Sequence, residues 1–235
     1  MPTSLGRRLV AELLGTGLLV AVVIGSGIAA QRLSADVGLQ LLANSLATGG
    51  GLVALILAFG AVSGAHFNPV VTLAERAFGA MTSREAGAYV CAQVVGAVAG
   101  AVIANLMFEL PAIEVATRAR LTGATFLAEV VATAGLLLVI LGVVRSGRSN
   151  SSPFAVAGYI VAAYWFTSST SFANPAVTIG RTLSDTFAGI APASAPGFVA
   201  AQVLGGAGAI GIARYLHPHL PDAELVVPHE SEIAP

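Results

Sequence analysis

The chain alternates between long apolar stretches and short gaps that hold most of its charged residues. A helix needs about 20 residues to cross the hydrocarbon core of a bilayer. Two apolar pieces, 69–79 and 175–183, are too short for this, and such pieces beside full spans are typical of re-entrant half-helices. Six other stretches are predicted to span the membrane: 7–30, 40–62, 84–108, 121–144, 153–170 and 195–216.

The composition agrees with a lipid environment. Hydrophobic residues make up 56% of the chain and charged residues 10%, whereas soluble domains carry about 25% charged residues. The net charge of −1 and the lack of a basic cluster argue against nucleic acid as a partner. The spans contain no nucleophile–base pair and no metal-ligand cluster. We therefore expect a multi-pass membrane protein that is not an enzyme and binds no metal or cofactor.

Each short apolar piece follows an Asn-Pro pair, Asn68-Pro69 in one case and Asn174-Pro175 in the other. Asparagine caps helices and proline suits the first turn, so each amide is predicted to lie at the positive end of a helix dipole. A helix can begin inside the hydrocarbon layer only beside a water-filled or protein-lined cavity. An ordinary loop cap would explain one such pair. The duplication favours two helix starts that line a pore.

An internal repeat relates the two halves of the chain. Residues 8–20 resemble residues 126–139, and residues 89–97 resemble residues 198–206. Each half then reads span, span, half-helix, span. Because three spans are an odd number, the second half must enter the membrane inverted, and the half-helices approach each other from opposite faces.

This repeat predicts four regions along the chain: a first repeat over 1–108, a linker over 109–120, a second repeat over 121–216 and a flexible cytoplasmic tail over 217–235. More arginines fall on the side of the membrane that holds the N-terminus than on the other side. The positive-inside rule then places that side in the cytoplasm. We expect both termini to be cytoplasmic and the protein to lie in the inner (plasma) membrane of the cell.

In these features the chain resembles the aquaporins, the major intrinsic protein family. The resemblance rests on the six spans, the two Asn-Pro half-helices, Glu12 and Glu129 in the first span of each half, and His66 in the segment Gly-Ala-His-Phe-Asn-Pro. It implies an all-α membrane fold with six transmembrane helices, two re-entrant half-helices and an inverted internal repeat. It also implies a homotetramer with one pore in each subunit.

The resemblance further implies a midplane constriction and a narrow outer filter. In the family the residue after the second Asn-Pro-Ala is nearly always arginine, but here it is Val177. The family's spacing places the other filter positions at Thr48, Ala162 and Ser171. The predicted filter has four small side chains, with no aromatic ring and no fixed cation. The first box reads Asn-Pro-Val, which adds bulk at the predicted midplane, formed by Asn68, Val70, Asn174 and Ala176.

A filter without a cationic donor fork predicts a passive channel that is wider than a strict water channel. Small neutral polar solutes fit such an opening, in particular metalloid hydroxy acids such as arsenite, together with water or glycerol. The chain resembles a bacterial arsenic-associated subgroup of aquaporins that carries this valine. A plain water or glycerol facilitator, a secondary transporter with inverted repeats and a structural membrane protein with a closed pore are the alternatives.

Four charged or titratable side chains inside the apolar segments need a role. Glu12 and Glu129 are expected to accept hydrogen bonds from the re-entrant loop of their own half, and a proton relay or ion site is the alternative. His66 is expected either to line the inner pore or to pack in the interior. Arg181 either faces the outer vestibule, where it can attract anions, or snorkels or pairs with Asp185.

Overall fold

The computed structural model describes residues 3–217, which form helices and loops without a strand. Of the tail predicted over 217–235, only His217 belongs to the described residues. Within the described range, five helices are long and apolar enough to cross a membrane: α1 (Leu5–Leu33), α2 (Val37–Ser63), α4 (Ser83–Met107), α5 (Gly123–Arg145) and α8 (Ala195–Leu216).

The sixth crossing is made by α6 (Ser152–Phe166), which is shorter than the others and follows the 3-10 turn η1 (Ser149–Ser151). The sequence predicted a span that reached residue 170. The helix stops at Phe166 because the chain then enters the second re-entrant loop, where Thr170 and Ser171 have left-handed backbone conformations that a helix cannot contain.

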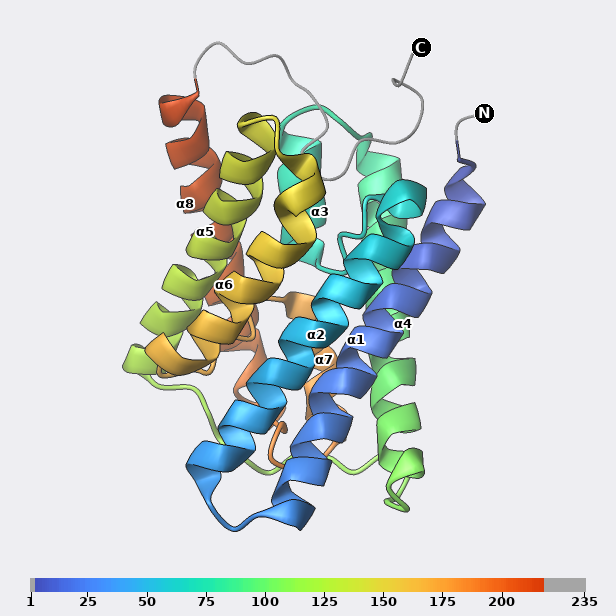
Figure 1. Cartoon of the computed structure of the whole chain (residues 1–235), viewed down its shortest axis with the longest axis vertical. Helices are drawn as coiled ribbons and strands as arrows, with labels where there is room; N and C mark the ends of the chain where they lie inside the picture. Colours follow the sequence, from blue (N-terminus) through green and yellow to red (C-terminus); the bar gives the residue numbers. More distant parts are fainter. Residues whose placement is uncertain (1–2, 218–235) are drawn as a thin grey trace.

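The half-helices are α3 (Pro69–Ala77) and α7 (Pro175–Gly180), and η2 (Arg181–Leu183) continues α7. Both begin at a proline after an asparagine cap, whose side-chain oxygen accepts a hydrogen bond from the backbone of the first turn. In Figure 1, α3 lies in the upper half of the bundle and α7 in the lower half. The two half-helices therefore enter from opposite ends.

The same packing recurs in the two halves of the bundle. In the first half α1 packs against α2 and α4, and in the second half α5 packs against α6 and α8. A Cβ atom on Gly96 would lie 2.2 Å from the carbonyl oxygen of Leu13, and one on Gly205 would lie 2.4 Å from that of Val130. Both distances are shorter than van der Waals contact, so these helix pairs approach closely only because the residues are glycines.

The two ends of the bundle differ. We call the end that holds the start of α1 and the end of α8 the terminal end, and the opposite end the linker end (Figure 1). The linker runs across its end and bonds to the segment after α7, with Ala116 N donating to Thr182 O at 2.9 Å and Ala191 N donating to Arg118 O at 2.8 Å. These bonds fix the chain around that mouth of the bundle.

Candidate functional site

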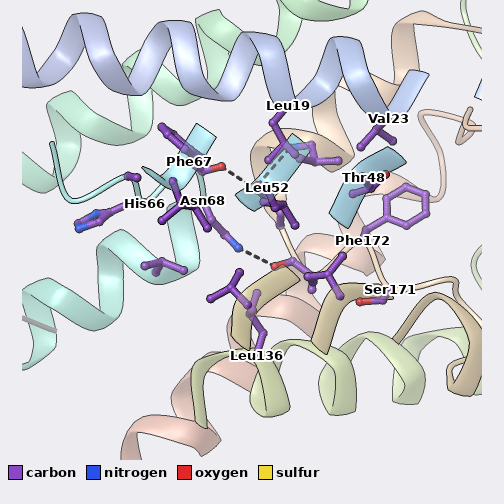
Figure 2. Close-up of a pocket in the computed structure, with 18 of the residues that line it drawn as sticks. Leu19, Val23, Thr48, Leu52, His66, Phe67, Asn68, Leu136, Ser171 and Phe172 are labelled. Carbon is purple, nitrogen blue, oxygen red and sulfur yellow. Dashed lines mark hydrogen bonds between the residues drawn. The ribbon is translucent and has the colours of Figure 1, made fainter. Parts of the chain in front are cut away.

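The starts of the two half-helices meet in the middle of the bundle. Asn68 Nδ2 donates to the carbonyl oxygen of Ala173 at 2.8 Å, and Asn174 Nδ2 donates to that of Phe67 at 2.7 Å, as the dashed lines in Figure 2 show. Each asparagine thus binds the loop of the opposite half. A side-chain amide carries two N–H donors, so each keeps one for the cavity that both asparagines line.

The loops before the half-helices have matching backbones. Ala65 and Phe67 have φ angles of 50° and 49°, and Ser171 and Ala173 have φ angles of 49° and 48°. None of these is glycine, and each left-handed residue of this kind costs on the order of 1–3 kcal/mol. The surrounding structure must therefore hold both loops in place.

The first loop is held by Glu12, whose carboxylate is fully buried. One oxygen accepts from the backbone N–H of His66 at 2.9 Å, and the other accepts from the N–H of Phe67 at 2.8 Å. Gln93 of α4 donates its side-chain N–H to the same carboxylate at 2.8 Å. The negative charge is thereby satisfied by hydrogen bonds without a cation beside it.

Glu129 does the same for the second loop. Its two oxygens accept from the backbone N–H groups of Phe172 and Ala173, both at 2.9 Å, and from the side chain of Gln202 at 2.6 Å. Glu129 and Glu12 are not among the described residues that line the cavity. This placement fits the support of the loops rather than a proton relay or an ion site.

A cavity of about 70 Å³ runs past the two asparagines, which is room for several water molecules. In Figure 2, His66 lies on one side of Asn68, and Thr48, Ser171 and Phe172 lie on the other. The cavity is lined by residues from both halves of the chain. It therefore lies where the two halves of the chain meet.

Three of the four predicted filter residues, Thr48, Ser171 and Val177, line this cavity. Ala162 does not, because it is exposed on another face of α6. Tyr164 lines the cavity in its place, since residues two apart on a helix point in different directions. The hydroxyls of Tyr164 and Thr48 lie 3.1 Å apart, within hydrogen-bond distance.

The structure also corrects the predicted midplane. Val70 is buried and faces α8, where a Cβ atom on Gly206 would lie 2.4 Å from Val70 Cγ1. The extra bulk of the first box is therefore accommodated by a glycine and does not narrow the cavity. Ala176 is likewise buried, and it is not among the described lining residues. The next position along, Val71 in the first half, lines the cavity instead.

His66 lies toward the terminal end of the cavity and satisfies both expectations for it. It lines the cavity, and its ring also packs in the interior. His66 Nδ1 is 3.0 Å from the hydroxyl of Thr72, and the ring centroid is 5.2 Å from that of Tyr89.

An aromatic ring and a cation, neither of which belongs to the four predicted filter residues, also line this cavity. Phe172 and Arg181 both line it, and Arg181 is only 2% exposed. The guanidinium carbon of Arg181 lies 3.4 Å from the centroid of the Phe172 ring, and its Nε donates to Ala188 O at 2.5 Å. Arg181 does not form the alternative ion pair with Asp185, whose carboxylate instead accepts hydrogen bonds from Thr117.

Sequence reasoning missed Arg120, at the end of the linker. Its Nε and Nη2 donate to Gly189 O at 2.6 Å and Phe187 O at 2.8 Å, and its guanidinium carbon lies 5.4 Å from the centroid of the Phe172 ring. Burial, and then the charge of Arg181, lowers the pKa of Arg120. An arginine directly before a predicted span is a weak signal, since only the folded linker brings it to the cavity mouth.

Long apolar helices around two asparagine-capped half-helices, which meet over a cavity, define a membrane channel. A family model described as Major intrinsic protein matches residues 2–170. The chain is 51% identical to the aquaglyceroporin AqpS of Rhizobium meliloti (strain 1021) over 213 aligned residues. The aligned region covers 91% of each chain. It is 32% identical to Aquaporin Z of Photorhabdus laumondii over 168 aligned residues, and this region covers 64% of this chain and 71% of that one.

The fold is similar to the X-ray structure of the aquaglyceroporin from Plasmodium falciparum, with a TM-score of 0.75 at 22% identity, covering 92% of this chain and 98% of that one. The chain belongs to the major intrinsic protein family. The expected all-helical fold is thereby confirmed. The protein is a multi-pass membrane channel for water and small solutes rather than an enzyme.

Proposed function

We propose that this channel conducts compact neutral solutes that carry several hydroxyl groups, with arsenite in its uncharged form As(OH)3 and glycerol among them, together with water. The observation that carries the proposal is that Val177 lines the cavity together with the small side chains of Thr48 and Ser171. A valine at this position leaves open the space that an arginine would occupy in most of the family. The relative at 51% identity is itself named an aquaglyceroporin.

The polar groups of the cavity suit such solutes. Ser171 Oγ is buried and has no hydrogen-bond partner among the described residues, and the hydroxyls of Thr48 and Tyr164 lie in the same wall. These hydroxyls can donate and accept, as the hydroxyls of the solute can. Apolar side chains such as Leu52 line the cavity too. The solute therefore exchanges some of its water for weak contacts, as conduction requires.

The orientation and assembly are part of the proposal. The distribution of arginines supports a cytoplasmic terminal end and an outward-facing linker end in the inner (plasma) membrane of the cell. Large apolar side chains are exposed along the membrane helices, for example Leu18 at 49% and Leu57 at 58%. They suit contact with lipid and with other subunits, and we propose a homotetramer with one pore in each subunit.

The proposal is tested by stopped-flow light scattering on proteoliposomes, with water, glycerol and As(OH)3 compared at neutral pH. The wild-type channel should pass all three faster than protein-free vesicles. The variant Val177→Arg should pass water but lose glycerol and As(OH)3 flux by roughly tenfold or more, because a guanidinium fills the opening. Wild-type vesicles that pass only water, or a variant with an unchanged solute preference, would contradict the proposal.

A further inference from the structure

The wall of the cavity toward the linker end contains an arginine one helical turn beyond Val177. Residues 177 and 181 lie four apart in the helical segment formed by α7 and η2, so they share a face. The guanidinium of Arg181 packs on the ring of Phe172, and Arg181 and Val177 line the same cavity.

The guanidinium of Arg181 is fixed in place and forms no direct ion pair with another described residue. Among residues 3–217, the hydrogen bond from Nε to Ala188 O is the only one that the guanidinium makes. The ion pair between Arg8 and Glu85 does not involve Arg181. The terminal nitrogens of Arg181 make no hydrogen bond within the described residues, and the carboxylate that attracts its charge, Glu129, is engaged by the N–H groups of the second loop.

The ring against which Arg181 packs is held from a second side. Phe172 lies 3.4 Å from the guanidinium carbon of Arg181 and 5.4 Å from that of Arg120, each measured to the ring centroid. Arg120 is tied by two hydrogen bonds to the carbonyls of Phe187 and Gly189, which flank Ala188. The acceptor of Arg181 and its aromatic platform are therefore both braced by the linker.

We propose that Arg181 supplies the cation of the selectivity filter from one turn beyond the usual position, so that the channel excludes cations while Val177 keeps the opening wide. The inference deepens the proposed function, because it assigns the charge of the same filter. A fixed charge in a narrow, poorly solvated passage repels small cations strongly. A neutral hydroxylated solute instead accepts hydrogen bonds from the free guanidinium N–H groups.

The test measures leak and solute flux in the same proteoliposomes. Sodium and proton leak are read with ion-sensitive dyes, and glycerol flux by light scattering. Arg181→Ala and Arg181→Gln should each raise cation leak by about tenfold or more, because a single charge is worth more than 1.4 kcal/mol in such a passage. Glycerol flux should persist. Glutamine preserves a donor for Ala188 O, so Arg181→Gln isolates the charge if Arg181→Ala folds poorly.

Two further variants complete the experiment. Arg118→Ala is the matched control, because Arg118 is an exposed arginine at the same mouth and is not among the described lining residues. It should leave cation leak unchanged. The double variant Val177→Arg with Arg181→Ala returns the charge to the usual position and should restore exclusion while it lowers glycerol flux.

A leak in Arg181→Gln equal to that of the wild type would overturn the assignment, and so would an equal rise in Arg118→Ala. Failure of the wild type to pass glycerol would count against the proposed function alone, since the leak is measured separately.

Discussion

At the scale of single residues, two buried carboxylates hold the strained backbone from which the site is built. Glu12 and Glu129 each accept two backbone hydrogen bonds from a loop with left-handed residues, and each accepts a third from a glutamine, Gln93 or Gln202. The carboxylate is suited to this position because it offers only acceptors. A neutral amide of the same shape would place an NH2 group against a loop N–H.

Glu129→Gln is therefore expected to destabilise the fold. One of the loop N–H groups loses its acceptor, which should lower the free energy of unfolding by about 1.5–3 kcal/mol. Thermal unfolding in detergent measures the change. The matched control is Glu85→Gln, at a partly exposed ion pair with Arg8, where the loss should be about 1 kcal/mol or less. Equal losses in the two variants would argue against a special role for the buried carboxylate.

At the scale of elements, glycines set how closely the helices of each half can pack. Gly96 brings α4 against α1, and Gly205 brings α8 against α5 at the equivalent place. These contacts bring Gln93 and Gln202, one helical turn earlier, within reach of the buried carboxylates. The close packing of helices and the support of the re-entrant loops are thus parts of one arrangement, present twice.

Gly205→Ala should separate α8 from α5. The added methyl group would lie 2.4 Å from the carbonyl oxygen of Val130, and such overpacking costs about 1–3 kcal/mol. Gly208→Ala, in the same helix, has no atom within 4 Å of the added methyl group. It should be neutral or raise the unfolding free energy by up to about 1 kcal/mol. Thermal unfolding of both variants decides the matter, and similar melting temperatures would refute the close contact.

At the scale of the whole molecule, the two halves form one passage rather than two separate sites. The cavity takes lining residues from α1, α2, α5 and α6 as well as from both re-entrant segments. The only carboxylates deep in the spans are held by loop and glutamine N–H groups and do not line the cavity. No group of the described lining is thus placed to couple solute movement to an ion gradient through a carboxylate.

Flux through the molecule should accordingly be passive. Glycerol uptake into proteoliposomes should rise in proportion to the gradient over the whole concentration range that the assay allows, without a dependence on an imposed proton or sodium gradient. Protein-free vesicles provide the background. Saturation at low concentration, or accumulation of glycerol against its gradient, would favour the secondary transporter instead.

Much of this molecule could be predicted from the sequence because its signals are local. The lengths of apolar stretches locate the spans, and the Asn-Pro pairs locate the starts of α3 and α7 at Pro69 and Pro175. Errors arose where a prediction needed the rotational phase of a helix. The spacing from Val177 back to Ala162 crosses the re-entrant loop and the last turn of α6, and it misses Tyr164, which lines the cavity.

The contribution of the linker was beyond sequence reasoning for a different reason. Arg120 approaches Phe172 only because Ala116 and Arg118 bond to the chain after α7. That pairing joins segments far apart in the sequence, and no periodic pattern signals it. The cation at the mouth could be proposed from its spacing to Val177, but its aromatic platform could not.

The reciprocal bonds between the two asparagines and the two loops have a consequence for biogenesis. Each half lends a carbonyl to the other, from Phe67 to Asn174 and from Ala173 to Asn68. A half that has been inserted alone therefore has an amide and a carbonyl without a hydrogen-bond partner in the lipid interior. Unsatisfied polar groups are energetically costly there. The midplane of the cavity can therefore form only after both halves have been synthesised and inserted into the membrane.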